Sequence, residues 1–292
     1  MDLNTFFEGI RMMPEAVSEA AELQIPEEGY QKMKRLFRTD KDGFYRAVLK
    51  EKNFRLRFLY YFSRMACDTY ECYRERNVDE KIYWDTFYDL TIWCENCFQQ
   101  FGEYGINEYK WFFRHIECSI WRLGRLEFEE MSVYWKEIDE NTEIQEYIPV
   151  LNVHIPQGEK LELSAVKASF GQAFQRWGSQ IPFICDSWLL YPGLAEILPA
   201  ESNIIKFQKL FRIMRVDFDG GEAQRRIFGR LSEDPADYPE ATSLQKMLMY
   251  GKEASNRKQE IDRQHHTIPN QRSQRPKDKH YGNVHNRLWN HG

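Results

Sequence analysis

The spacing of apolar residues changes at Gly124, and this change constrains the fold more than any other feature of the sequence. Before Gly124, apolar residues recur every three or four positions, as they do on the buried face of a helix. From Leu126 to Trp135 they alternate loosely with charged residues, as they do in a half-buried strand. The sequence therefore predicts an α+β protein in which a helical part precedes a β-sheet.

Helix breakers divide the N-terminal part into several segments. They lie at Pro14, at the Ile25-Pro26 pair, at residues 40–43 and at residues 102–105. Core faces are predicted between Glu80 and Leu123 from Ile82, Tyr83, Phe87, Leu90, Trp93, Trp111, Phe112, Ile116 and Ile120. We predict a mainly helical domain over residues 1–140, with the first strand of the sheet near residues 124–135.

Charge is distributed unevenly along the chain. The net charge is −5, but residues 252–292 contain nine Lys and Arg against four Asp and Glu, leaving 31 against 41 in residues 1–251. An acidic body lacks the clustered cations that neutralise phosphates, which argues against nucleic-acid binding by the folded part. Residues 252–292 are basic and poor in apolar residues, so we predict a disordered tail.

Several classes of protein are disfavoured by other sequence features. No run approaches the roughly 18 apolar residues of a bilayer span, and the first eleven residues do not resemble a secretory signal. We therefore expect a soluble, cytoplasmic protein whose six cysteines are reduced core residues. Cys94 and Cys97 have the spacing of half a zinc site, but no second pair accompanies them, so we predict no metal centre.

The second half of the chain is predicted to alternate strands and helices. A strand at residues 147–155 leads through a Pro-Gln-Gly turn into a helix at residues 163–177. A short strand at 181–190, helices at 191–198 and 202–211, and a strand at 212–218 are predicted to follow, with Ser202 capping the second helix. We predict a ligand-binding domain over residues 141–251.

The segment from Asn152 to Leu161 is the first candidate site. A strand that passes through a glycine turn into a helix directs free backbone N–H groups and the positive helix end at one point, where a pyrophosphate can bind. Any strand-to-helix connection needs a turn, however, and the G-x-x-x-x-G-K-[ST] pattern of a P-loop is absent. An ordinary turn therefore remains the alternative.

Two further groups of side chains are candidates for a ligand site. Asp186, Ser187 and Trp188 follow a predicted strand and could line a crevice at its carboxyl end, or could cap the next turn. No G-x-S-x-G pattern surrounds Ser187, which argues against an acyl nucleophile. His154 ends a predicted strand and could act as a base, although a hydrogen-bonded core histidine is the commoner case.

Five short segments together resemble a bacterial family of predicted acyltransferases with a helical N-terminal domain and a GNAT-like C-terminal domain. They are His154–Gly158, Cys185–Leu190, Ser202–Phe207, Ile227–Gly229 and Thr242–Gln245, in the family's order. The resemblance implies a mixed sheet that splits like an open V, with acyl-CoA in the split and its pantetheine paired with a strand edge.

The resemblance also implies which residues bind the acyl-CoA. The pyrophosphate loop would consist of Pro156, Gln157, Gly158, Glu159, Lys160 and Leu161. We assign Ser202 and Asn203, at the start of a predicted helix within the resemblance, to the same binding site.

By resemblance, the chain is expected to be an acyl-CoA-dependent N-acyltransferase that uses acetyl-CoA or another acyl-CoA and a small-molecule or peptide amine. We predict His154 or Glu129 as the base, and Ser187 or Tyr191 as the partner of the leaving thiolate. Phe207 stands where the family pattern has a Tyr, and the sequence turns polar at Lys252, where the family continues into a closing strand. A non-catalytic module that senses a ligand or binds a protein is therefore the alternative.

Overall fold

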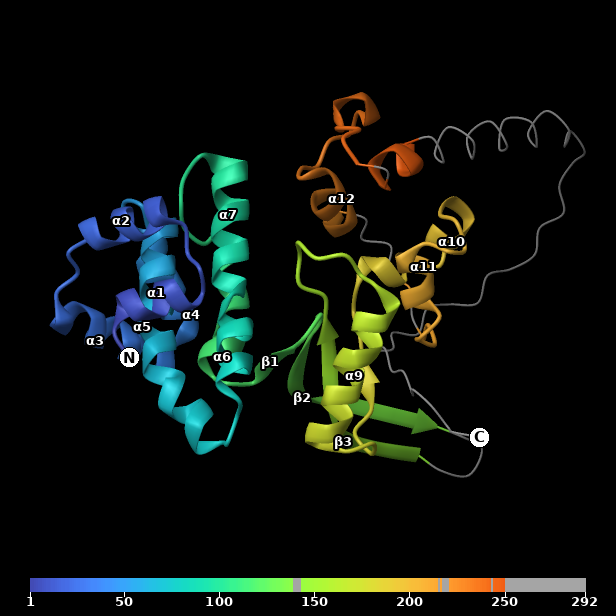
Figure 1. The fold of residues 1–292 in the computed structure, drawn as a ribbon, viewed down its shortest axis with the longest axis horizontal. Coiled ribbons are helices and arrows are strands. Elements are labelled where there is room, and N and C mark those ends of the chain that lie inside the picture. The colour runs from blue at the N-terminus through green and yellow to red at the C-terminus, as the bar shows by residue number, and fades with distance from the viewer. Residues whose placement is uncertain (139–142, 215, 217–220, 243, 250–292) are drawn as a thin grey trace, which may run out of the picture. The chain divides into compact units, whose positions relative to one another are not determined.

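The structure is a computed structural model that describes residues 1–138, 143–214, 216, 221–242 and 244–249. Two compact units divide the chain, Met1–Phe183 and Ile184–Gly292, and each is described by itself. The first unit contains a helical part followed by a sheet with one covering helix (Figure 1). The predicted disordered tail at 252–292 lies outside the described residues.

The helical part is organised around the 22-residue helix α5, which contacts α1, α2, α3, α4, α6, α7 and α8 (Figure 1). Its buried side chains include Phe58 and Phe62, which stack on each other and extend the core through Tyr109 and Phe112. The elements are α1 (Leu3–Gly9), α2 (Pro14–Glu22), α3 (Glu27–Thr39), α4 (Lys41–Leu49), α5 (Phe54–Glu75), α6 (Glu80–Phe87), α7 (Asp89–Phe101), the 3₁₀ turn η1 (Tyr109–Trp111) and α8 (Phe113–Ile116).

The predicted helix breaks occur where the sequence places them. Pro14 is the first residue of α2, where its missing N–H costs nothing, and Pro26 is the N-cap of α3. The carboxylate of Asp40 accepts a hydrogen bond from the Gly43 amide and caps α4. Gly102 ends α7 in the left-handed conformation, with a φ of 68°. These boundaries are confirmed.

A four-stranded mixed sheet follows in the order β1-β2-β3-β4. The strands are β1 (Ile120–Leu123), β2 (Leu126–Ile138), β3 (Glu143–His154) and β4 (Phe183–Ile184). β1 and β2 form an antiparallel hairpin, and β2 pairs antiparallel with β3 from Glu127↔His154 to Ile138↔Glu143. Helix α9 (Leu163–Trp177) connects β3 to β4, has the predicted bounds and contacts β1 and β2 (Figure 1). This arrangement confirms the predicted α+β class.

Several predicted element boundaries are wrong. The first strand of the sheet, β1, precedes the predicted range of 124–135, and β3 begins at Glu143 rather than at residue 147. Ile120 does not continue a helical face with Ile116, because α8 ends at Ile116 and Cys118 has a φ of 55°, a left-handed conformation that breaks the helix. Ile120 instead begins β1. The strand predicted at 181–190 is shorter: β4 covers only Phe183–Ile184. The predicted domain boundary at residue 140 falls in the β2–β3 connection, whose residues 139–142 are outside the described residues, and it stays a prediction.

The second unit consists of short helical elements. They are η2 (Trp188–Leu190), α10 (Leu194–Ile197), α11 (Asn203–Gln208), α12 (Gly221–Phe228) and η3 (Pro235–Asp237), and residues 244–249 are also helical. Leu194, Leu198 and Ile205 form a small core. The predicted strand at 212–218 is wrong for its described residues, since 212–214 and 216 have no regular structure.

The structure bears on two expectations from the sequence, the lack of a membrane span and the state of the cysteines. No helix in the described part of the chain is long and apolar enough to cross a membrane. All six cysteines are free thiols, and five of them are buried. Cys94 is buried in the helical core, where its sulfur accepts a hydrogen bond from the Gly105 amide at 3.3 Å.

Candidate functional site

Two buried arginines lie at the turn of the β1–β2 hairpin, Arg125 within it and Arg122 two residues before it. Leu123 pairs with Leu126, so Gly124 and Arg125 form a two-residue turn, and Gly124 has the positive φ of 68° that such turns require. Arg122 and Arg125 are only 4% and 5% exposed. The backbone amide of Arg125 donates to the Ser169 hydroxyl of α9 at 2.9 Å, which holds the turn against the helix.

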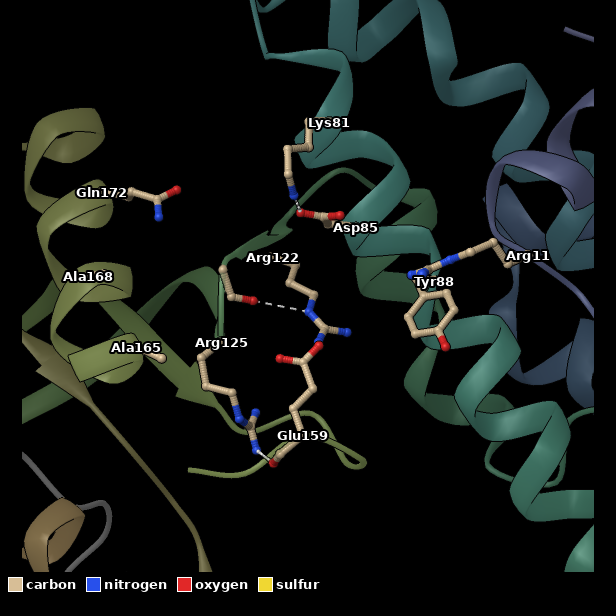
Figure 2. A pocket seen from close by; sticks show the side chains of 11 residues that line it. Arg11, Lys81, Asp85, Tyr88, Arg122, Arg125, Glu159, Ala165, Ala168 and Gln172 are labelled. Atoms are coloured by element: carbon tan, nitrogen blue, oxygen red, sulfur yellow. Dashed lines mark hydrogen bonds and ion pairs between the residues drawn. The ribbon is translucent and has the colours of Figure 1, made fainter. Parts of the chain in front are cut away.

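Both guanidinium groups hold the loop that follows β3. Arg125 donates through Nη2 to the carbonyl oxygen of Glu159 at 2.8 Å and through Nε to that of Lys160 at 3.1 Å. Arg122 donates through Nη2 to the Glu159 carboxylate at 3.1 Å (Figure 2). Hydrogen bonds from a charged donor are about twice as strong as neutral ones, so the loop is fixed by the hairpin.

The loop itself is buried at its ends and open in the middle. Pro156 and Leu161 are buried, whereas the four residues between them are exposed. Gly158 has a φ of 105°, and a Cβ at this position would meet no heavy atom within 4 Å. Helix α9 begins just beyond the loop without a side-chain cap and without an acidic residue in its first turn. The N-cap residue is Glu162, but its side chain makes no capping bond, so the first N–H groups of α9 can bind an anion.

A cavity of about 350 Å³ lies beside this loop. Four of its lining side chains are cationic and two are acidic: Arg11, Lys81, Arg122 and Arg125 against Asp85 and Glu159 (Figure 2). Tyr88, Gly124, Ala165, Ala168 and Gln172 complete the lining. Lys81 pairs with Asp85, so the cationic excess comes from the arginines.

His154 and Glu129, predicted as alternative bases, form one hydrogen-bonded pair. Nε2 of His154 lies 2.9 Å from Oε2 of Glu129. Arg114 donates through Nε to the other carboxylate oxygen at 2.8 Å, and Trp111 contacts the His154 ring edge-on at 4.8 Å between ring centroids. Burial acts to raise the pKa of Glu129, but the bonds from His154 and Arg114 outweigh it and hold that pKa below its usual range.

This geometry assigns different roles to the two side chains. Because Glu129 is an ionised carboxylate, Nε2 of His154 carries the hydrogen and donates it. Nδ1 is then the ring nitrogen that can accept a proton. The His154 side chain is 18% exposed, which leaves it accessible to a small molecule. The pair can act as a general base whose imidazole is oriented by the carboxylate.

The remaining predicted site residues lie in the second unit. The Ser187 hydroxyl accepts a hydrogen bond from the Leu189 amide at 3.3 Å, and that of Ser202 accepts one from the Ile205 amide at 3.2 Å, so both act as caps. Asn203 is the first residue of α11. Tyr191 is 44% exposed. Their predicted roles in binding and catalysis stay predictions.

The sequence analysis did not identify the three arginines of the site. Arg122 and Arg125 lie three positions apart around Gly124, and two cations so close to a glycine turn are a signal that the sequence contains. Arg114 gave no such signal, because its link to Glu129 joins residues 15 positions apart on a helix and a strand. The spacing of apolar residues within one helix or strand does not predict a contact between side chains of two different elements.

The conformation of Gly158 can be tested against a matched glycine. Gly158→Ala should lower the free energy of unfolding by about 1–2 kcal/mol, because a φ of 105° strains a residue with a Cβ. Gly171→Ala should raise it by roughly 0.5–1 kcal/mol, because Gly171 lies inside α9 with equally open space around it. Urea unfolding of both variants measures the difference. Effects of the same sign would contradict the loop geometry.

Two protein-family models match consecutive parts of the chain. The model for an N-acyltransferase N-terminal domain matches residues 1–118, and that for a GNAT-like C-terminal domain matches residues 120–258. No curated protein sequence matches significantly.

Solved acyltransferase structures share the fold. One, in complex with decanoyl-CoA and teicoplanin, is 19% identical with a TM-score of 0.59, and the match covers 87% of this chain and 96% of that one. A mutant acyltransferase in complex with octanoyl-CoA gives the same values. By the two family models together, which match residues 1–118 and 120–258, the chain belongs to the family of acyltransferases in which a helical N-acyltransferase N-terminal domain precedes a GNAT-like C-terminal domain.

Proposed function

We propose that the protein is an acyl-CoA-dependent N-acyltransferase. The observation that carries the proposal is the loop at residues 156–161, which is open in its middle, is held by two buried arginines and leads into the uncapped end of α9. A pyrophosphate is the group in acyl-CoA that such a concentration of N–H groups and positive charge suits. The structural relatives with decanoyl-CoA, octanoyl-CoA and CoA support this assignment.

The proposed reaction uses the histidine–glutamate pair. An amine nitrogen of the acceptor attacks the thioester carbonyl, His154 takes a proton from that nitrogen through Nδ1, and the C–S bond breaks to release the CoA thiolate. Glu129 stabilises the imidazolium that forms. Fixing amine and thioester next to each other supplies much of the rate, since it converts a bimolecular reaction into one within a complex.

A second group must protonate the leaving thiolate, and Ser187 and Tyr191 are the proposed candidates. Phe207 is excluded, because a phenyl ring carries no proton donor; it is 1% exposed and packs against Phe211 in the second unit. Thiol release by the Ser187→Ala and Tyr191→Phe variants will show which of the two hydroxyls is used.

For the substrates we propose a medium-chain acyl-CoA and a small-molecule or peptide amine. The solved relatives contain eight- and ten-carbon acyl groups, and one of them contains teicoplanin, which supports a sizeable acceptor. The acetyl group remains the shortest candidate. Thiol-release rates across a series from acetyl-CoA to decanoyl-CoA, with one amine, will rank the chain lengths.

Binding of CoA is expected to stabilise the protein. A ligand at a hundredfold its Kd adds about 2.7 kcal/mol to the free energy of unfolding, so the melting temperature should rise by several degrees. Thermal shift with CoA, decanoyl-CoA and decanoate measures this, and decanoate, which lacks the phosphates, should have little effect. A melting temperature unchanged by CoA and by decanoyl-CoA contradicts the proposal.

The second candidate function is a ligand-sensing or protein-binding module without catalysis. The buried Phe207 favours it, because the described helix α11 offers no hydroxyl at that position. The two functions differ in one measurement: a sensor binds acyl-CoA without releasing thiol in the presence of amines, whereas an enzyme releases it.

A further inference from the structure

Three ionisable side chains meet in the interior of the first unit. Asp89 is the first residue of α7, His115 lies in α8 and Glu127 lies in β2, and they are 2%, 0% and 1% exposed. One potential ligand atom from each lies within 4.8 Å of the other two. This is the single group of three or more His, Cys, Asp or Glu side chains in the described residues with that property.

Three polar atoms of this cluster, on His115 and Glu127, lack hydrogen-bond partners among the described residues. Both ring nitrogens of His115 and Oε1 of Glu127 are buried and unpartnered among the described residues. Buried polar atoms without a protein partner are rare in folded proteins, and a bound ion or water molecule usually satisfies them. These three atoms of His115 and Glu127 can therefore bind an additional ion or water molecule.

One separation in the cluster suits two ligands of a metal ion better than a direct hydrogen bond, and all three potential ligand atoms lie within 4.8 Å of one another. Nε2 of His115 lies 3.5 Å from Oδ2 of Asp89, which is long for a hydrogen bond. Two ligands on one tetrahedral ion, each bound at about 2.0–2.2 Å, are roughly 3.3–3.6 Å apart. The observed separation falls in that range.

The surroundings of Asp89 resemble the outer shell of a metal ligand. The indole N–H groups of Trp111 and Trp93 donate to Oδ2 of Asp89 at 2.6 and 3.3 Å. Carboxylates that bind metals usually accept such bonds, which orient them toward the ion. Arg122 and Arg125 also act electrostatically on Glu127. Within the described residues, however, their side chains donate hydrogen bonds to Gly124, Glu159 and Lys160, and Nη1 of each has no partner there.

We propose that Asp89, His115 and Glu127 bind one divalent transition-metal ion. One imidazole and two carboxylates without a thiolate are a ligand set suited to Zn²⁺, Mn²⁺ or Fe²⁺. The ion would join α7, α8 and β2, and so fasten the helical part to the sheet. It would also fix Trp111, which bonds Asp89 through its indole and contacts His154 with its ring.

Metal content of the full chain, purified without a polyhistidine tag, tests the site. We expect about one equivalent of metal per chain by mass spectrometry after dialysis. Protein stripped with a chelator should take up one equivalent of Zn²⁺ and regain its melting temperature. His115→Gln and Glu127→Gln should lose that equivalent, whereas His154→Gln and the tail variant His265→Gln/His266→Gln should keep it.

A second measurement uses the wild-type protein alone, so its result does not depend on whether the variants fold. Stripped wild-type protein loaded with Co²⁺ should show ligand-field absorption without thiolate charge-transfer bands, since the proposed ligands contain no cysteine. Absence of metal from both native and Zn²⁺-treated protein overturns the proposal, and so does metal that remains in a folded His115→Gln variant. The arginines and buried water would then satisfy Glu127. Neither result bears on CoA binding, which the thermal-shift experiment measures separately.

Discussion

Replacing His154 by Gln should lower kcat for acyl transfer by about 10²–10³-fold, the contribution typical of a general base. Gln keeps a donor toward Glu129 but has no atom that accepts a proton near neutral pH. The Kd for CoA should stay within about twofold, because the loop and the arginines of the CoA site do not contact His154 in the proposed mechanism. Steady-state thiol release and calorimetric binding separate the two quantities.

Two variants control for this result. Glu129→Gln should lower kcat less than His154→Gln does, because it removes the orientation of the imidazole but not the proton acceptor. His285→Gln, in the tail, should have wild-type kinetics. If His154→Gln retains the wild-type kcat, or loses activity only through a higher KM for acyl-CoA, then His154 is not the base.

Replacing Arg125 by Gln should weaken CoA binding by about 10–100-fold and lower the melting temperature. The side chain makes two charge-assisted bonds to loop carbonyls, and each such bond contributes about 1.5–3 kcal/mol. Part of that loss destabilises the protein, and part releases the loop from the geometry that binds a pyrophosphate. Calorimetry with CoA and thermal unfolding measure the two effects.

The matched control for Arg125 is an arginine that does not touch the loop. Arg176 stacks over Trp121 at 4.1 Å from its ring centroid, and Arg176→Gln should lower stability slightly with no change in the Kd for CoA. Arg125→Lys should restore part of the binding, because it keeps a cation but not the forked geometry. Equal Kd values for all three variants would contradict the role of Arg125.

The segment from β3 through α9 was predictable because its signals are local. Gly158 marks the turn, the apolar spacing from Val166 to Trp177 marks the helix, and Gly178 ends it with a φ of 79°. The predicted phosphate loop rests on the same local signals.

The parts that were not predictable depend on contacts between distant segments. The strand β1 directly follows a helix of four residues, and its apolar residues are too few to show their period. Glu129 and His154 are diagonal neighbours across the antiparallel pair of β2 and β3, since Glu129 pairs with Asn152 and His154 with Glu127, and Arg114 reaches Glu129 from α8. Register between strands, rather than sequence spacing, brings these three side chains together.

Hydrogen exchange of the loop amides tests the central claim most directly. With CoA bound, amides of residues 157–163 should exchange much more slowly, because the pyrophosphate would accept hydrogen bonds from them. Pantetheine, which has the same thiol arm without phosphates, should leave them unchanged. Protection of these amides by CoA and not by pantetheine is the predicted result; CoA binding that leaves their exchange unaltered would contradict the account.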